Sequence, residues 1–475
     1  MEPKKFYITT TLPYANGAPH VGHTMEFIRA DIIARHKRQQ GARVFFNTGT
    51  DEHGQKIAEN AEAQGQTPQV YVDQIAGEWK DFCKSINMSY DFFSRTTNSR
   101  HIKSAQELWK RCAENGFIYK KDYQTKYCVG CELEKQDGEL ADGACPDHSN
   151  REIELIDEEN YFFAFSKLEK ELLNFYKQSS VLPQFRENEI KGFVEGGLQD
   201  FSISRLKEKM SWGVPVPGDD EHVMYVWFDA LTSYISCLGW GTEDANLFDM
   251  YWKDGETLQL CGKDNLRQQT AIWQAMLMAA GLPTTNTIFI EGHIVSGGKK
   301  MSKSVGNVVD PFLYIEKYGI DAVRYYIARH VHNTQDSDWT AESFHEAYQA
   351  NLVNGIGNLT NRILKMSSSY GVTLDEPEIK PGNELLDTYD FSGALDEIFK
   401  FIGSMDQFIT DEAPFKKVKT DPDAAAKDVQ YLLEKLWEVT MLIAPIMPET
   451  YGKMRVALEE NQKPTEPLFP RVELQ

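Results

Sequence analysis

The chain has 475 residues, of which 41% are hydrophobic and 25% charged, a composition typical of a globular protein with roughly two to four domains. Its 50 Lys and Arg residues are outnumbered by 71 Asp and Glu residues, so the net charge at pH 7 is −21. This charge argues against a polybasic protein that coats DNA, and no DNA partner is expected, because phosphate contacts need clustered Lys and Arg. A nucleic-acid enzyme with a locally basic site remains compatible with it.

The sequence contains no apolar run of about 18 residues or more, so no membrane-spanning segment is predicted. The N-terminal sequence MEPKKFYITTTLPYANG lacks the apolar core of a signal peptide, which predicts a cytoplasmic protein. In a reducing compartment the seven cysteines are expected to be thiols or metal ligands rather than disulfide partners.

The N-terminal residues predict the start of a doubly wound parallel sheet. Residues 5–10 form a short β-rich run, and a loop with two prolines follows it. From Gly22 to Gly41 apolar residues recur at helical spacing, which predicts a helix. The next segment, ARVFFNTGTDEHG, is a buried-strand pattern that ends in a polar loop. In such a sheet, ligands bind at the carboxyl ends of the strands, where these polar loops fall.

The rest of the chain predicts an insertion, a second sheet segment and a helical region. Between residues 116 and 200 the pattern breaks into short elements around a Cys/His cluster. Strands are then predicted in HVMYVWFDA, LQLCGKD and NTIFIEGHIV, and from about Gln335 only helices are expected. The predicted units are residues 1–115 and 201–334 (the two halves of the α/β domain), 116–200 (the insertion) and 335–475 (the helical domain).

The helical region shows two apolar faces and one segment apolar enough to be a central bundle helix, Val429–Met447. The residues of the two faces are Leu352, Ile356, Leu359 and Ile363 in the first, and Leu395, Ile398, Phe399, Ile402 and Met405 in the second.

Two histidines lie where the first predicted loop enters its helix. In His20-Val21-Gly22-His23 the free backbone N–H groups of the helix start favour an anion, and Gly22 allows a close backbone approach. Two imidazoles three residues apart could donate hydrogen bonds to phosphate oxygens. Taken alone, the HxxH pattern favours a pair of capping or surface histidines.

A basic loop follows the last predicted strand. The sequence Lys299-Lys300-Met301-Ser302-Lys303-Ser304 is flanked by glycines on both sides. Such a loop can move onto a polyphosphate and neutralise developing charge. Alone it could also be a solvated loop, but its combination with the upstream histidines favours a nucleotide site.

Four residues have the spacing of a zinc site. Cys128-x2-Cys131 and Cys145-x2-His148 are pairs at the spacing of a zinc knuckle, with thiolate and imidazole ligands for tetrahedral Zn²⁺. A closed four-ligand site predicts one structural ion that holds the small insertion together.

The two motifs HVGH and KMSKS together resemble those of class I aminoacyl-tRNA synthetases, and the remaining blocks are similar to methionyl-tRNA synthetases. These blocks are TTLPYANGAPHVGH, GTDEHG, GLQDFSISR, YVWFDALTSY, GKD and LFPRVE, and they span essentially the whole chain. The resemblance implies an α/β fold: a Rossmann-type parallel-sheet catalytic domain with a zinc-binding connective insertion, followed by an α-helical anticodon-binding bundle.

The resemblance implies that methionine and ATP form methionyl-adenylate and that the methionyl group is then transferred to the 3′ end of methionine tRNA with a CAU anticodon. Mg²⁺ is expected with the nucleotide. The residues implied in catalysis and ATP binding are His20, Gly22, His23, Arg205, Gly262, Asp264, Lys300 and Lys303. Because the attacking carboxylate is already ionised at neutral pH, no general base is needed.

The resemblance also implies an apolar pocket for the methionine side chain, with Asp51 as the anchor of the ammonium group. The matching positions are Leu12, Tyr14, Trp227, Ala230, Leu231, Tyr234, Asn265, Gln269 and Trp273. Three residues depart from the family's usual pattern. Asn265 and Gln269 replace an isoleucine and a histidine, and Glu291 stands where a histidine commonly occurs. Methionine is still expected as the substrate, with altered pocket contacts.

Three polar residues of the helical region match the family's anticodon-reading helix. Asn354, Asn358 and Arg362 have i, i+4 and i+8 spacing, which predicts one polar face on one helix. Helix capping or ordinary surface polarity would explain these three equally well if they stood alone. No tryptophan follows Trp437, although the family often stacks one on the first anticodon base.

Two other functions fit part of the sequence. A nucleotidylyltransferase also uses an HxGH loop, but the length, the KMSKS block, the Cys/His cluster and the helical region disfavour it. An inactive synthetase-like RNA-binding protein is disfavoured by the intact His20, His23, Lys300 and Lys303. Valine or isoleucine specificity would call for a larger insertion.

No sequence follows LFPRVELQ that could form an appended dimerisation module, so a monomer is predicted.

Overall fold

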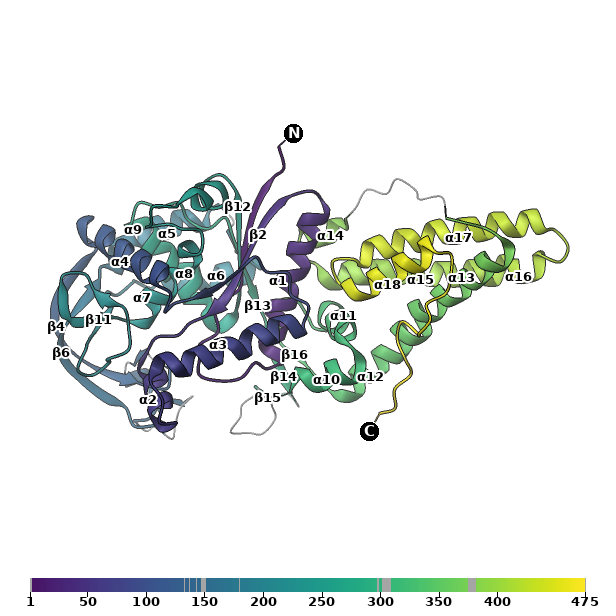
Figure 1. Cartoon of the computed structure of the whole chain (residues 1–475). Coiled ribbons are helices and arrows are strands. Elements are labelled where there is room, and N and C mark those ends of the chain that lie inside the picture. Colours follow the sequence, from purple (N-terminus) through teal and green to yellow (C-terminus); the bar gives the residue numbers. More distant parts are fainter. Residues whose placement is uncertain are drawn as a thin grey trace.

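The computed structural model contains two parts, an α/β region and an elongated helical bundle that extends from one side of it (Figure 1). The structure describes residues 2–131, 133–135, 137–141, 143–146, 151–178, 180–296, 299–300, 309–374 and 382–474, with backbone only at 123, 125, 133, 134, 137, 156, 299 and 300.

The α/β region is built on a six-stranded parallel sheet with strand order β3-β2-β1-β12-β13-β7. Its strands are β1 (Lys5–Thr9), β2 (Arg43–Thr50), β3 (Phe92–Arg95), β7 (Val181–Leu182), β12 (Glu256–Gly262) and β13 (Thr287–Glu291). The strand order reverses between β1 and β12, which is where ligands bind in doubly wound sheets. The predicted Rossmann-type parallel sheet is thereby confirmed.

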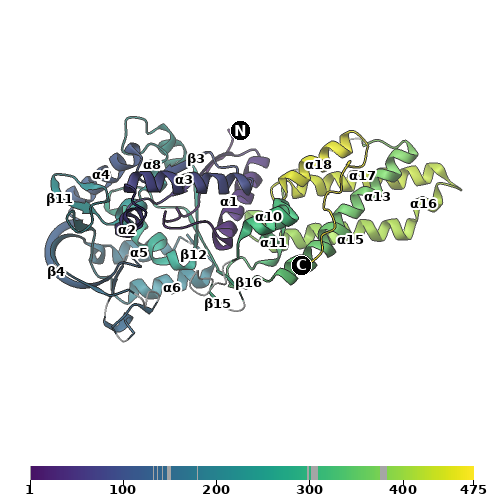
Figure 2. The same ribbon diagram turned by 60° about the horizontal axis from the view of Figure 1, so that its bottom comes forward.

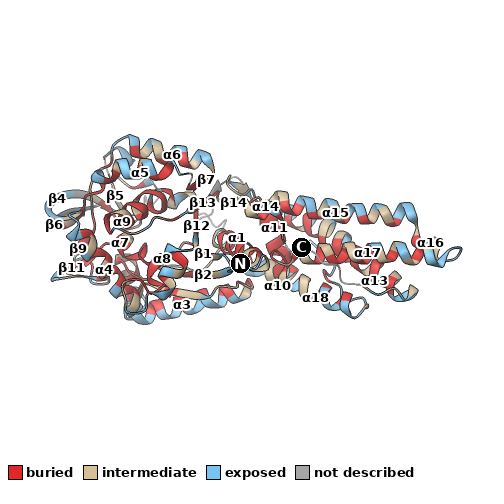
Figure 3. Ribbon diagram, turned by 90° about the horizontal axis from the view of Figure 1, so that it is seen from above, coloured by how far each residue is buried: buried red, intermediate tan, exposed pale blue. Residues whose placement is uncertain are grey.

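Helices cover both faces of this sheet. Because side chains alternate along a strand, Ile8 of β1 packs with α1 (Val21–Gln39) and α3 (Pro68–Ser85). Its neighbour Tyr7 belongs to the opposite core, with α4 (Ser99–Glu114) and α9 (Trp273–Ala279). Figure 3 shows the buried residues gathered between these layers.

The predicted insertion contains a separate antiparallel sheet. Its strands, in the order β5-β4-β6-β8, are β5 (Leu133–Lys135), β4 (Ile118–Cys128), β6 (Glu154–Phe163) and β8 (Phe201–Ser202). The following α5 (Glu169–Tyr176) and α6 (Gln184–Glu195) flank β7, which pairs with β13. Part of the segment 116–200 therefore belongs to the main sheet.

The segment HVMYVWFDA is only half strand. β11 (Asp219–Met224) pairs antiparallel with β9 (Ser204–Leu206) and β10 (Pro215–Val216), and a helix, α7 (Val226–Ala230), follows at once. The prediction of a single strand was wrong there, because a short apolar run does not distinguish a buried strand from a buried helix.

A short strand also occurs in the region where only helices were predicted. β16 (Ser337–Asp338) pairs parallel with β14 (Ile294–Ser296), and β14 pairs with β15 (Lys299–Lys300). The backbone after Gln335 is thereby tied to the strand that precedes the basic loop. The helices α10 (Pro311–Tyr318) and α11 (Ile320–His330) lie between these strands in the sequence.

The helical bundle is built mainly from α13 (Asn358–Tyr370), α15 (Phe391–Glu412), α17 (Pro422–Ile443) and α18 (Pro448–Glu459), with α12 (Ala341–Ala347), α14 (Glu384–Asp387) and α16 (Pro414–Lys417) around them (Figure 2). The first predicted apolar face is fully buried, and the second is buried except for a partly buried Phe399. The central helix α17 begins at Pro422 rather than at Val429, because Asp421 caps it and Pro422 suits a first helical turn. Within the described residues, none of the helices combines the length and apolar character needed to cross a membrane.

Candidate active site

A cavity of about 360 Å³ lies at the carboxyl ends of β1 and β12, where the strand order reverses. Most of the residues predicted for the two substrates line it. These are Leu12, Tyr14, His20, Gly22, His23, Asp51, Trp227, Ala230, Leu231, Tyr234, Gly262, Asp264, Asn265 and Gln269. Segments more than 200 residues apart in the sequence thus converge on one site.

The two histidines cap the first helix. His20 is the N-cap of α1; its Nδ1 accepts a hydrogen bond from Gly22 N at 3.2 Å, and His23 Nδ1 accepts one from His20 N at 3.3 Å. Because Nδ1 is an acceptor in both rings, the neutral imidazoles carry their proton on Nε2. The rings lie 3.8 Å apart, so they present a pair of N–H donors at a helix N-terminus.

Gly22 keeps the space beside these rings open. A Cβ at this position would lie 3.0 Å from the imidazole of His20. At Gly262, the end of β12, a Cβ would lie 2.8 Å from Asp264 Oδ1. At either glycine, an added Cβ would crowd the side chain of a lining residue, which would have to shift.

Glu26 is a lining residue that sequence analysis missed. Its Oε1 accepts hydrogen bonds from Thr11 N at 2.6 Å and from Thr11 Oγ1 at 2.5 Å. Burial, reinforced by the nearby charge of Glu291, raises the pKa of the Glu26 carboxyl well above its usual value. Glu26 lies three residues after His23, so helical spacing alone was a signal that both face the same site.

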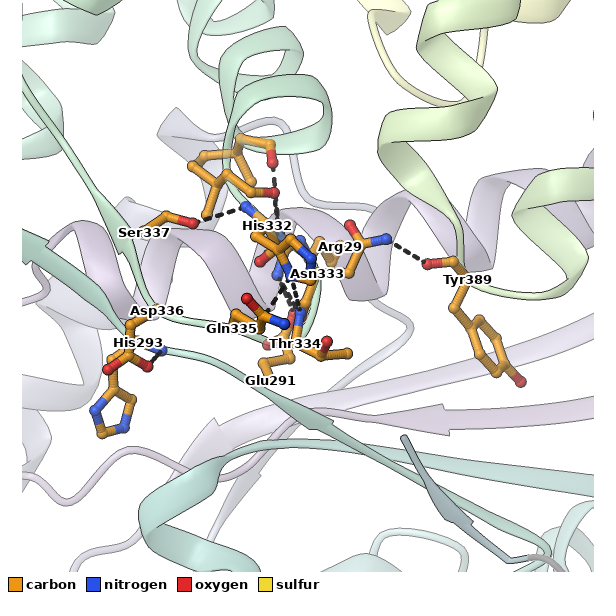
Figure 4. Close-up of polar contacts among 12 residues, drawn as sticks. Arg29, Glu291, His293, His332, Asn333, Thr334, Gln335, Asp336, Ser337 and Tyr389 are labelled. Carbon is orange, nitrogen blue, oxygen red and sulfur yellow. Dashed lines mark hydrogen bonds and ion pairs between the residues drawn. The ribbon is translucent and has the colours of Figure 1, made fainter. Parts of the chain in front are cut away.

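Glu291 also lines the cavity, and its partner explains why a glutamate suits this position. Arg29 NH1 donates to Glu291 Oε1 at 3.1 Å, and both side chains are fully buried. Arg29 NH2 also donates to Val331 O at 2.8 Å and to His332 O at 3.2 Å. Burial raises the pKa of the Glu291 carboxyl, while the Arg29 guanidinium opposes that rise. Figure 4 shows this pair beside the segment 332–337.

The segment 332–337 packs directly against the cavity wall (Figure 4). A Cβ at Gly292 would lie 2.2 Å from Gln335 O, and His293 N donates to Asp336 Oδ1 at 3.0 Å. On its other side, Asn333 Nδ2 donates to Tyr389 O of the bundle at 3.2 Å. The strand ahead of the basic loop is thus held by the segment that leads to the helical bundle.

The amino-acid side of the cavity is aromatic with one polar pair. Gln269 Nε2 donates to Tyr234 Oη at 2.5 Å, and burial raises the pKa of the Tyr234 hydroxyl well above its usual value. Asn265 lines the same region. Trp273 does not line the cavity; it lies behind Tyr234, with ring centroids 5.8 Å apart.

Asp51 lies at the end of β2, as predicted, and its loop is fixed against the loop after β1. Asp51 N donates to Pro13 O at 2.9 Å, and Ala15 N donates to Asp51 O at 2.8 Å. The side chain of Asp51 is buried at the cavity edge. The backbone therefore sets the position of this carboxylate.

Arg205 does not line the cavity, although it was predicted near the nucleotide. Its guanidinium lies 4.8 Å from the ring centres of both Tyr127 and Tyr225, and it donates to Ser202 Oγ at 2.8 Å. Tyr127 precedes the first cysteine of the cluster, and Tyr225 precedes α7. Arg205 thus connects these two segments.

The basic loop is described only in part. Lys299 and Lys300 form the two-residue strand β15, of which the structure describes the backbone alone. Lys303, with the rest of 301–308, lies outside the described residues.

The three cysteines lie together, with Sγ atoms all within 4.8 Å of one another and 3.4 Å between Cys131 and Cys145. A tetrahedral zinc with Zn–S bonds of about 2.3 Å separates its sulfurs by about 3.8 Å, so this donor set fits the ion. The fourth predicted ligand, His148, lies outside the described residues. Cys131 also lines the cavity, so the cluster adjoins the active site.

The predicted anticodon residues do not share one regular helix. Asn358 and Arg362 lie on α13, but Asn354 precedes it in a π-helical segment, Tyr348–Gly357, which is kinked at Gly355 (φ −85°, ψ −107°). Glycine permits this departure from helical geometry. Asn354 lines a groove of about 520 Å³ between this segment and α15, and Arg362 NH1 lies 2.5 Å from Asp406 Oδ1 on the same helix α15.

Comparison with known families and proteins gives one consistent result. The model described as "tRNA synthetases class I (M)" matches residues 6–154 and 139–364, and the "Anticodon binding domain of methionyl tRNA ligase" matches residues 376–468. The methionine–tRNA ligase of Thermotoga maritima is 39% identical over 96% of this chain and 76% of its own length. That of Thermosynechococcus vestitus is 39% identical over 96% of this chain and 91% of its own length.

Solved structures agree with this result. The Mycobacterium tuberculosis methionyl-tRNA synthetase in complex with methionyl-adenylate superimposes with a TM-score of 0.90 at 33% identity, and the match covers 99% of this chain and 100% of that one. Together with the convergence of the two histidines, Asp51 and Asp264 on one cavity, these matches show that the chain belongs to the methionyl-tRNA synthetase family.

Proposed function

We propose that this cavity joins methionine to ATP as methionyl-adenylate, with release of pyrophosphate, and that the methionyl group then passes to the 3′ end of methionine tRNA with a CAU anticodon. The observation that carries this assignment is that the paired histidines and the Asp51 carboxylate line one cavity. A related synthetase of Mycobacterium tuberculosis was solved with methionyl-adenylate, which is the expected intermediate.

On the nucleotide side, the chain's residues stabilise charge rather than transfer protons. The Nε2–H groups of His20 and His23 donate to phosphate oxygens as the carboxylate of methionine attacks the α-phosphate. Lys300 and Lys303 bind the leaving pyrophosphate. Mg²⁺, bound with the nucleotide, neutralises part of the phosphate charge. Asp264 and Glu26 offer carboxyl oxygens as acceptors for ribose hydroxyls.

On the amino-acid side, Asp51 pairs with the ammonium group, and the aromatic wall surrounds the thioether. A polarizable sulfur suits contacts with Trp227 and Tyr234. Gln269 Nε2 is already engaged with the Tyr234 hydroxyl, whereas its buried Oε1 has no hydrogen-bond partner among the described residues and is an acceptor left for a donor in the pocket.

The cysteine cluster binds one structural Zn²⁺ through Cys128, Cys131 and Cys145, with His148 as the fourth ligand. Metal analysis is expected to give one zinc per chain, and Cys131→Ala is expected to remove it.

The helical bundle reads the anticodon through Asn354, Asn358 and Arg362, and the protein acts as a cytoplasmic monomer. Sedimentation that gave a stable dimer would contradict the monomer.

The decisive experiment is ATP–pyrophosphate exchange with each of the amino acids, followed by aminoacylation of a CAU-anticodon tRNA. We expect methionine alone to drive rapid exchange and the tRNA to become charged. Exchange driven best by another amino acid would overturn the assigned substrate, and exchange without charging would overturn the tRNA step.

A further inference from the structure

A buried cluster of polar side chains lies directly behind the cavity. Asp229 of α7 is bonded to two histidines: Oδ2 lies 2.6 Å from His53 Nδ1, and Oδ1 lies 2.6 Å from His101 Nε2. The other ring nitrogen of His101 lies 2.9 Å from Ser236 Oγ. These four residues are between 1% and 4% exposed, and none of them is a lining residue of the cavity.

The protonation states in this cluster follow from its geometry. Burial alone would raise the pKa of the Asp229 carboxyl, but the two histidines lower it to about 2. The carboxylate therefore accepts at both oxygens, and each histidine presents an N–H group to it. His101 presents its Nε2–H to Asp229, and its Nδ1 shares a hydrogen bond with the Ser236 hydroxyl.

The helix that carries Asp229 forms much of the amino-acid pocket. α7 has only five residues, too few for a helix that is stable by itself. Yet Val226, Trp227 and Ala230 of this helix all line the cavity. Contacts to other elements must therefore fix its position, and through Asp229 it is joined to the loop after β2 and to α4.

The loop after β2 is itself firmly held, and His53 is its link to α7. Arg95 Nε donates to Glu52 Oε1 at 2.6 Å. Trp212 Nε1 donates to Glu52 O at 2.6 Å, and Gly54 N donates to Trp212 O at 3.0 Å. With its neighbours fixed on both sides, His53 provides a rigid point to which Asp229 can attach.

We propose that Asp229 is a positioning residue for methionine, because through His53 it sets the distance between the carboxylate of Asp51 and the side-chain pocket on α7. This inference rests on the proposed function, in which Asp51 binds the ammonium group. In its bound conformer, methionine has one defined separation between its ammonium group and its thioether. The hydrogen bond from His53 to Asp229 therefore holds the two recognition points at the spacing of this substrate.

The two histidines have different roles in this arrangement. The His53 contact joins the pocket to the Asp51 loop, so its loss alters the spacing of the site. The His101 contact joins the pocket to α4, which carries none of the lining residues, so its loss weakens packing without changing that spacing. A comparison of the two histidines therefore separates positioning from stability.

The test uses pyrophosphate exchange with the full chain, with KM measured separately for methionine and ATP. For Asp229→Asn and for His53→Ala we expect the methionine KM to rise about tenfold or more, the range of a lost specificity contact, while the ATP KM changes less than about twofold. We also expect weaker discrimination against S-methylcysteine, which is one methylene shorter than methionine. His53→Asn, which keeps an N–H donor, is expected to recover part of the methionine affinity.

The matched controls are His101→Gln and Asp31→Asn, the latter a buried carboxylate that pairs with Arg324 at 2.7 Å away from the cavity. Both are expected to lower the unfolding temperature with an unchanged methionine KM.

Equal methionine KM increases for the His53 and His101 variants would overturn the inference, as would an unchanged methionine KM in an active Asp229→Asn. An unchanged methionine KM in Asp51→Asn would instead refute the anchor on which the inference rests, and absence of methionine-driven exchange in the unaltered chain would refute the proposed function.

Discussion

The catalytic cavity and the polar face of the helical bundle are built in opposite ways. The cavity gathers side chains from segments spread over most of the α/β region, and about half of its lining residues are buried. The bundle face consists of a few residues close in the sequence, with Asn354 and Asn358 exposed and Arg362 about 40% exposed beside Asp406. A change in the cavity is therefore expected to affect both half-reactions, whereas a change on the bundle face should affect only the one that needs tRNA.

The largest effect is expected at the buried Arg29–Glu291 pair, between the cavity and the segment that leads to the bundle. Arg29→Leu leaves the buried Glu291 carboxylate without its cationic partner, which costs about 3–5 kcal/mol of unfolding free energy. Denaturant unfolding of the variant measures this loss. If the double variant Arg29→Leu/Glu291→Leu is as unstable as the single one, the pair is not the source of the effect.

Within the cavity, His20→Asn tests the charge-stabilising role of the imidazole. Asparagine is a good N-cap, so α1 keeps its start, but the Nε2–H donor is lost. We expect pyrophosphate exchange to fall about 10²–10³-fold, the usual cost of one donor to a transition state, and aminoacylation to fall equally. A thermal unfolding curve close to that of the unaltered chain serves as the control. Unchanged exchange would show that His20 only caps the helix.

On the bundle face, Arg362→Gln is expected to spare the cavity. Loss of a charged hydrogen bond to an anticodon base costs about 1.5–3 kcal/mol, which lowers kcat/KM for tRNA by about 10–100-fold. Pyrophosphate exchange, which needs no tRNA, should remain unchanged. Lys365→Gln, an exposed change one turn further along α13, is the matched control. Equal losses in both variants would mean that only charge matters there.

The smallest expected effect is on the free energy of unfolding, and it arises because the Glu26 carboxyl is buried. Because its folded pKa is raised, the carboxyl stabilises the fold most when protonated, and this stability is lost as the pH rises through the folded pKa. Glu26→Gln should therefore be more stable than the unaltered chain at pH 8, by about 1 kcal/mol, with the difference vanishing at acidic pH. Unfolding midpoints measured across pH check this, and a difference independent of pH would contradict it.

The sequence predicted contacts between residues that are close in the chain, and it did not predict contacts between distant ones. The His20–His23 pair and the Cys128–Cys131 pair are local, so their spacing alone placed them. The Arg29–Glu291 pair joins residues 262 positions apart, and no local pattern points to it. Arg205 and Trp273 were assigned by resemblance to the substrate sites, yet neither lines the cavity, because a position in a motif does not reveal which side chain stands in front of another.

Helix α1 joins the cavity and the bundle as one continuous element. Its 19 residues correspond to about 28 Å of continuous helix. One end is capped by His20 at the cavity; at the other end, Lys37 Nζ donates to Asp387 Oδ1 at 2.7 Å and Gln39 Nε2 to Met441 O at 2.8 Å, both in the bundle. One continuous helix therefore sets the distance between the paired histidines and the bundle.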